Sequence, residues 1–161
     1  MSLKIREAKK EDIELILYFI KELAIYEKEP DAAVATYDGL LKDGFGEKPL
    51  FNILIAEWNN QPAGFAFYFF NYSTWLGRPG LYLEDLFVLT EYRKNGIGKS
   101  LLIELAKVAV RNNCGRFQWQ VLDWNKPAID FYESLGAIHQ KEWFTYRLSG
   151  ESLINLSEMK M

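Results

Sequence analysis

The chain has 161 residues, of which 49% are hydrophobic and 25% charged, so its composition is that of a globular protein and not of a disordered one. The formal net charge is −3 and no basic run exceeds two residues, which argues against nucleic acid as a partner. One cysteine and one histidine rule out an internal disulfide and leave a metal site short of its usual ligands, so we expect no metal.

Two further observations concern location and domain number. The longest apolar stretch, residues 63–70, is far shorter than the roughly 20 residues that a membrane-spanning helix needs. Residues 1–7 alternate between charged and apolar and lack the apolar region of a signal peptide. We therefore expect no membrane partner, a cytoplasmic location and one domain over residues 1–161.

The N-terminal half predicts a strand, two helices and a hairpin. Residues 3–7 alternate as a strand does, and apolar residues then recur at helical spacing from Ile13 to Ala24. Thr36 is suited to cap a short helix over residues 37–43. Residues 51–58 and 63–72 are rich in aromatic and β-branched residues and flank an Asn-Asn-Gln-Pro turn, so they predict an antiparallel hairpin. Residues 81–89 add a third strand.

The C-terminal half predicts alternating helices and strands. Residues 97–112 carry apolar side chains on one helical face, and Gly115 precedes a strand over residues 117–121. Asn125 is expected to cap a helix that has Pro127 in its first turn and ends at Leu135. A last strand is predicted over residues 143–148. This order of elements indicates a mixed α/β (α+β) fold.

The loop between strand 81–89 and helix 97–112 carries the clearest chemical signal. It reads Arg93-Lys94-Asn95-Gly96-Ile97-Gly98-Lys99. The unpaired N–H groups and the positive end of a helix bind phosphate, and glycine lets the main chain approach a pyrophosphate closely. The third glycine of the dinucleotide fingerprint and the Walker spacing are both missing, which excludes two other kinds of phosphate loop.

This loop resembles the acetyl-CoA signature of the GNAT N-acetyltransferases, Arg/Gln-x-x-Gly-x-Gly/Ala, through Arg93, Gly96 and Gly98. Nearly the whole chain is similar to the diamine (spermidine/spermine) and thialysine acetyltransferase subfamily. The matching blocks are Leu23-Ala24-x-Tyr26-Glu27, Asp43-Gly44-Phe45-Gly46-Glu47, Leu81-Tyr82-Leu83-Glu84-Asp85, Leu122-Asp123-Trp124-Asn125, Phe131-Tyr132 and Gly136-Ala137. The resemblance implies a GNAT fold, with a central, mostly antiparallel sheet, flanking helices and a parallel strand pair, residues 81–89 and 117–121, that splays apart.

The resemblance also implies a reaction, in which acetyl-CoA is the cosubstrate and a primary amine of a small diamine, polyamine or thialysine-like substrate attacks it directly. Tyr132 would be the general acid, because a phenol can donate a proton where the thiolate leaves. The residues implied to hold the cofactor are Leu86, Phe87, Val88, Arg93, Lys94, Asn95, Gly96, Ile97, Gly98, Lys99, Asn125, Lys126, Pro127 and Ala128.

The amine side would be acidic, since the substrate is a cation before it reacts. The implied substrate contacts are Tyr26, Glu27, Glu84, Gln118, Trp119, Gln120 and Glu142. Glu84 is the candidate proton acceptor. Neighbouring side chains in a strand point to opposite faces, so one of Glu84 and Asp85 is expected to face the core.

Two other functions stay open at this point. A shallow, open groove would favour acetylation of a protein or peptide amine, and a site that binds acyl-CoA without releasing thiol would be a sensor. The aromatic content of 16% suits a homodimer, whose interface the sequence does not locate.

Overall fold

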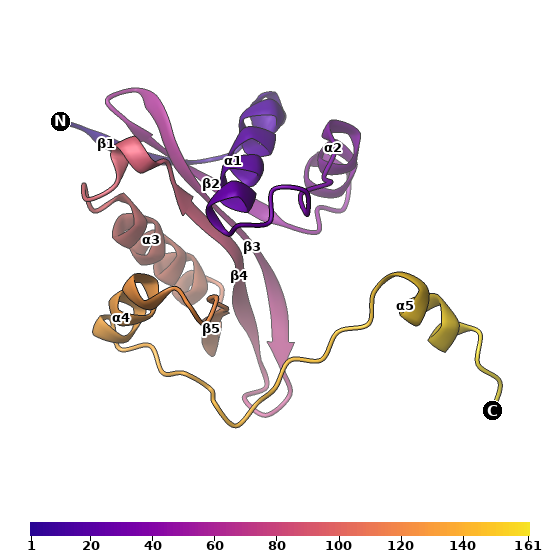
Figure 1. Cartoon of the computed structure of the whole chain (residues 1–161). Coiled ribbons are helices and arrows are strands. Elements are labelled where there is room, and N and C mark those ends of the chain that lie inside the picture. Colours follow the sequence, from indigo (N-terminus) through magenta and orange to yellow (C-terminus); the bar gives the residue numbers. More distant parts are fainter. The chain divides into compact units, whose positions relative to one another are not determined.

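A five-stranded sheet in the order β1-β2-β3-β4-β5 is the frame of the first of two units in the computed structural model, which describes residues 1–161 (Figure 1). The two units are residues 1–122 and 123–161. The strands are β1 (Leu3–Glu7), β2 (Asn52–Trp58), β3 (Gln61–Ser73), β4 (Arg78–Val88) and β5 (Arg116–Trp119). All neighbours pair antiparallel except β4 and β5, which are parallel. The mixed fold class predicted from the sequence is therefore confirmed.

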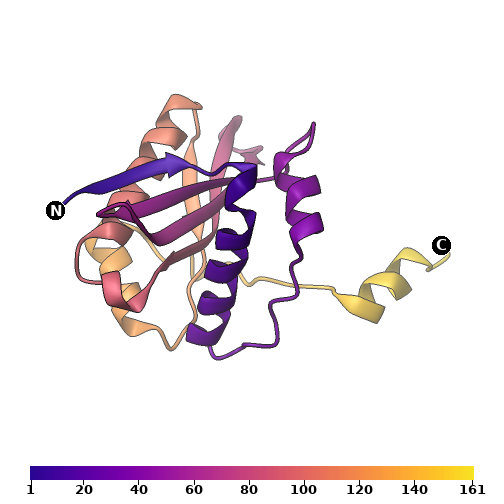
Figure 2. The same cartoon turned by 90° about the horizontal axis from the view of Figure 1, so that it is seen from above.

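Helices cover both faces of this sheet (Figure 2). The first unit contains α1 (Ile13–Tyr26), α2 (Tyr37–Phe45) and α3 (Ile97–Arg111), with short 3₁₀ turns η1 (Lys10–Asp12) and η2 (Thr90–Tyr92). The residues of α1 and α2 form one core cluster with one face of β2, β3 and β4, where Phe19 stacks on Phe65 with ring centroids 5.3 Å apart. Helix α3 lies on the opposite face and buries the apolar stripe expected from its spacing.

Local sequence signals explain where the helices begin. The Gly39 N–H donates to Thr36 Oγ1 at 3.1 Å, which confirms the predicted cap of α2. Phe19 is fully buried in α1. None of the helices is long and apolar enough to span a bilayer.

A β-bulge interrupts β4 at Glu84. Along the ladder with β3, Asp85 lies opposite Phe67 and Leu83 opposite Tyr68, so Glu84 has no cross-strand partner. Phe67 packs against the core cluster under α1 and α2, and Asp85 shares this face because directly opposed residues point the same way. The bulge thus sets the direction of the carboxylates at the middle of β4.

The second unit holds α4 (Lys126–Ser134) and α5 (Gly150–Ser157). The predicted strand over residues 143–148 is wrong, since this segment has no regular structure, and α5 was not predicted. Aromatic residues gave the segment its strand-like composition, but a strand forms only with a partner, and residues 123–161 contain none. Trp143, Phe144 and Tyr146 are consequently exposed.

Candidate active site

The C-terminal half of β4 has an open edge. β5 pairs with β4 only from Gly80 to Leu83, whereas β4 continues to Val88. The next residue, Leu89, donates its N–H to the Ala63 carbonyl of the β3 side at 2.8 Å. Because hydrogen-bonded and non-hydrogen-bonded pairs alternate along an antiparallel ladder, the main-chain groups of Leu86 and Val88 point to the open edge. The predicted parallel pair is therefore present, and beyond Leu83 the β4 strand has no strand partner on this side, which leaves peptide groups of Leu86 and Val88 for an extended ligand.

The loop that follows β4 ends at a helix N-terminus without a capping side chain. Lys94 and Gly96 have left-handed φ values of 67° and 74°. Helix α3 starts at Ile97, receives no side-chain cap and has no acidic residue in its first turn. Its first N–H groups lack partners within the helix and carry the positive end of the helix dipole. This arrangement suits an anion such as a pyrophosphate.

Gly98 provides a test of whether the loop fits that ligand. A Cβ built at Gly98 would have Val88 Cγ2, at 3.9 Å, as its nearest neighbour, so the packing of the protein itself accepts a side chain there. The packing of the protein therefore does not itself require glycine at this position, which leaves room for a ligand to approach the main chain. Gly96 differs, because its positive φ alone favours glycine.

The remaining loop residues divide into outward and inward groups. Lys94 and Lys99 are exposed beside the helix end, where they add positive charge. Asn95 donates from Nδ2 to the Tyr92 carbonyl at 3.0 Å and so closes the turn. Arg93 points inward, and its Nε donates to the Val88 carbonyl at 2.9 Å.

Three carboxylates stand at the acidic end of the site. Asp85 is half-buried, Glu84 is exposed at the bulge, and Glu27 directly follows the last residue of helix α1. Burial, and then the negative charges of Glu84 and Glu27, raise the pKa of Asp85 to about 7. Burial also raises the pKa of Glu27. No cation is among the groups that shift the pKa of Asp85 or Glu27, and none of the three carboxylates is in an ion pair of the protein.

Asp85 is the residue that sequence reasoning missed. One of the two carboxylates was expected to face the core, and Asp85 does so, directly opposite Phe67, although Glu84 was the predicted proton acceptor. Asp85 is the more sheltered of the two, while Glu84 is exposed. No feature of the single sequence marks the bulge, although the adjacent carboxylates did mark the position.

The other predicted substrate residues of the first unit come from α1 and β5. Tyr26 is the last residue of α1 and lies next to Glu27. On β5, Gln118 is opposite Tyr82 and Trp119 is opposite Leu83, at the point where the two parallel strands separate. Gln120 is exposed just beyond the end of β5.

The second unit carries the other predicted residues. Asn125 Oδ1 accepts from the Ala128 N–H at 3.4 Å, which confirms the predicted cap of α4, and Lys126 Nζ donates to Asp130 at 2.8 Å. Pro127 lies in the first turn of α4. Tyr132 is half-buried on α4 beside Phe131, and Glu142 is exposed between α4 and α5.

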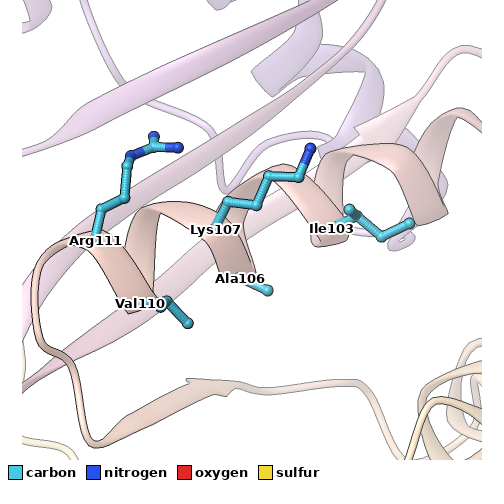
Figure 3. A pocket seen from close by; sticks show the side chains of 5 residues that line it. All are labelled: Ile103, Ala106, Lys107, Val110 and Arg111. Atoms are coloured by element: carbon cyan, nitrogen blue, oxygen red, sulfur yellow. The ribbon is translucent and has the colours of Figure 1, made fainter.

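A hollow elsewhere in the first unit does not belong to this site. About 500 Å³ in volume, it is lined by α3 residues alone (Figure 3), namely Ile103, Ala106, Lys107, Val110 and Arg111. It contains no carboxylate and none of the predicted site residues. No group of three or more histidine, cysteine or acidic side chains is arranged to hold a metal ion.

Comparison with known proteins agrees with the geometry. Residues 14–137 match the acetyltransferase (GNAT) family. The chain belongs to this family. It is also 43% identical to the thialysine N-epsilon-acetyltransferase of Sus scrofa, over 97% of this chain and 98% of that protein. The family predicted from the sequence is therefore confirmed, and this GNAT protein is an acetyltransferase.

Two further comparisons extend the family likeness. The GNAT chain is 39% identical to a human spermidine/spermine N(1)-acetyltransferase-like protein 1, over 96% of this chain but only 24% of that protein. Among solved structures, an integron cassette protein from the mobile metagenome of V. cholerae superimposes with a TM-score of 0.83 at 29% identity, over 99% of each chain. The fold is therefore shared along the whole chain.

Proposed function

We propose that this GNAT enzyme transfers an acetyl group from acetyl-CoA to a primary amine of a small cationic substrate, a diamine, polyamine or thialysine-like compound. The observation that carries the proposal is the group of uncompensated carboxylates, Glu27, Glu84 and Asp85, close in the fold to the open edge of β4. A cationic amine supplies the missing charge. Relatives named for thialysine and spermidine/spermine acetylation support this substrate class.

The residues present fit acetyl-CoA. The main chain of Leu86 and Val88 would hold the pantetheine arm along the open edge of β4. The N–H groups from Ile97 to Lys99, together with Lys94, would hold the pyrophosphate. We assign Asn125, Lys126, Pro127 and Ala128 to the same ligand from the family resemblance.

Acetyl-CoA supplies an activated carbonyl carbon, to which the amine nitrogen bonds as the carbon–sulfur bond breaks, without an acyl-enzyme. The carboxylates of Glu84 and Asp85 accept the amine proton. A pKa of Asp85 near 7 keeps this acceptor effective at neutral pH. Tyr132 Oη donates a proton to the departing thiolate, a role we assign from its match to the family motif.

The test is a substrate panel with thiol release as the readout. Putrescine, spermidine, spermine, thialysine, lysine and peptides with a free N-terminus or lysine are compared at equal concentration. We expect thiol release with one or more of the small amines and none with the peptides. Activity restricted to peptides would indicate a protein acetyltransferase, and acyl-CoA binding without thiol release for any amine would indicate a sensor; either result contradicts the proposal.

The cofactor assignment has its own test. Acetyl-CoA at about 100 times its dissociation constant stabilises a protein by about 2.7 kcal/mol, which corresponds to a rise in Tm of roughly 5–10 °C for a chain of this size. We expect Gly98→Val to fold but to lose this rise, because the protein has room for a side chain at Gly98 whereas a bound pyrophosphate does not. An unchanged rise in folded Gly98→Val would contradict the pyrophosphate assignment.

We also propose that the enzyme is a homodimer. Residues 143–148 expose Trp143, Phe144 and Tyr146, and α5 exposes Leu153, Ile154 and Leu156. β5 is an edge strand of the sheet, and an edge strand offers unpaired N–H and C=O groups to another chain. A second copy of the chain could cover the exposed apolar side chains and pair with the free edge of β5.

Sedimentation velocity tests the dimer. We expect the parent to be a dimer. The double variant Phe144→Ser, Tyr146→Ser removes exposed aromatic surface and should be a monomer. Val34→Ser, at another exposed apolar position, serves as the matched control and should remain dimeric. A monomeric parent, or a double variant that is still a dimer, would contradict this interface.

A further inference from the structure

Arg93 stands between the two halves of the proposed site. Its guanidinium carbon lies 4.5 Å from the centroid of the Tyr26 ring and 5.4 Å from that of Phe87. Its Nε donates to the Val88 carbonyl at 2.9 Å. The side chain is half-buried, in contrast to the neighbouring Lys94, which is exposed.

The three partners of Arg93 come from both ligand regions. Tyr26 ends α1 and adjoins Glu27 on the amine side. Val88 ends the open edge of β4 on the cofactor side, and Arg93 itself begins the glycine loop. A planar guanidinium can stack on aromatic faces and donate a hydrogen bond in its own plane at the same time, which a lysine ammonium cannot do.

We propose that Arg93 is a positioning residue that couples binding of the cofactor to binding of the amine through its contact with Tyr26. The inference rests on the proposed function, because it takes Tyr26 to be part of the amine site. While the guanidinium stays between them, the glycine loop and the C-terminal end of α1 move together. Ordering of the loop by the pyrophosphate therefore also fixes the Tyr26 ring, and coupling of this kind is reciprocal in free energy.

Binding of free CoA tests the coupling without turnover. Isothermal titration calorimetry compares the parent with Tyr26→Leu, Arg93→Met and the double variant. We expect Tyr26→Leu to weaken CoA binding about fivefold or more, although Tyr26 is assigned to the amine and not to the cofactor. In the Arg93→Met background, Tyr26→Leu should have no further effect on CoA binding.

Two control variants separate coupling from general damage. Tyr26→Phe keeps the aromatic face and should restore the CoA affinity of the parent. Lys94→Met removes an exposed loop cation and should weaken CoA binding by a factor that multiplies with that of Tyr26→Leu. Circular dichroism and Tm establish that each variant is folded; an unfolded Arg93→Met is replaced by Arg93→Lys, which loses the Nε donor.

The outcomes distinguish the inference from the function on which it rests. CoA affinity that is unchanged in Tyr26→Leu, or effects of Tyr26→Leu and Arg93→Met that multiply independently, would overturn the coupling while leaving the acetyltransfer proposal intact. A parent that binds no CoA would overturn the proposed cofactor site and the coupling together. The inference is supported if Tyr26→Leu weakens CoA binding in the parent but has no effect on it in the Arg93→Met background.

Discussion

The first unit contains two clusters of carboxylates that differ in how their charge is balanced. In one, Arg6 donates to Asp12 and to Glu57, each at 2.8 Å, and its guanidinium lowers the pKa of Asp12. In the other, burial and the charges of Glu84 and Glu27 raise the pKa of Asp85 to about 7. The protein neutralises the first cluster itself, whereas the second suits an external cation.

The clusters also differ in their relation to the fold. Arg6 connects β1, β2 and η1, far from the glycine loop in the sequence, and its interactions are internal. Asp85 stands at the bulge of β4, a few residues before the loop that suits a pyrophosphate. We therefore propose that the Arg6 cluster stabilises the fold and that the Asp85 cluster takes part in proton transfer, and four substitutions test this division.

The largest effect is expected from a substitution that changes neither cluster. Tyr132→Phe should lower kcat by roughly 10² to 10⁴, the usual contribution of a general acid, with unchanged binding of acetyl-CoA. Steady-state kinetics with calorimetric binding measure both. If kcat stays within about twofold of the parent while chemistry is rate-limiting, Tyr132 is structural and proton transfer depends on the carboxylates alone.

Glu84→Gln should lower kcat/KM at pH 7 by roughly 10². An alkyl ammonium with a pKa of about 10.4 is almost fully protonated at this pH, and the variant lacks one of the carboxylates that accept its proton. The loss should shrink toward pH 9, where more amine arrives neutral. Glu27→Gln is the matched carboxamide control, and it should chiefly raise KM for the amine. Equal kcat/KM for Glu84→Gln and the parent at pH 7 would remove Glu84 from the mechanism.

Asp85→Asn should stabilise the protein at alkaline pH. The native pKa of Asp85, about 7, lies above the ordinary value of 3.8, so the native state binds its proton more tightly and loses stability as the pH rises through 7. The neutral asparagine avoids this loss, and we expect a gain of about 2–3 kcal/mol at pH 8 and none at pH 4. Urea unfolding at both pH values measures it; a variant less stable than the parent at pH 8 would contradict the assignment.

Arg6→Met should act in the opposite direction. It removes the guanidinium donor of the half-buried carboxylates Asp12 and Glu57, which costs about 1–2 kcal/mol near neutral pH. Because the native pKa of Asp12 is depressed, this stability is present above its unfolded pKa and disappears as the pH falls through the native one. Thermal unfolding at pH 7 and pH 3 detects the change, and KM for the amine should stay constant. A raised KM would show that the two clusters are not independent.

The parts of the site that lie in one continuous segment were predictable from the sequence. Gly96 and Gly98 predicted the N-terminal end of α3, and the spacing of the apolar residues between Ile97 and Ala109 predicted the helix itself. Thr36 and Asn125 likewise marked helix starts, because caps act within a few residues.

The parts that depend on pairing between distant segments were not predictable. The bulge beside Asp85 exists only in the register with β3, and the contact of Arg93 with the Tyr26 ring joins the glycine loop to α1, which is distant in the sequence. The failed strand over residues 143–148 has the same origin, since its composition is that of a strand but its unit contains no partner.

Direct titration of Asp85 tests the central claim that its cluster is kept for a cation. Carbon-13 NMR of the aspartate carboxyl carbons, with Asp85→Asn to assign the signal, follows its pKa in the free enzyme and in the presence of CoA and spermidine, which cannot react. We expect a midpoint near 7 in the free enzyme and a lower one with the amine bound, because a nearby cation favours the carboxylate. A midpoint near the ordinary 3.8, or one that the amine leaves unchanged, would contradict it.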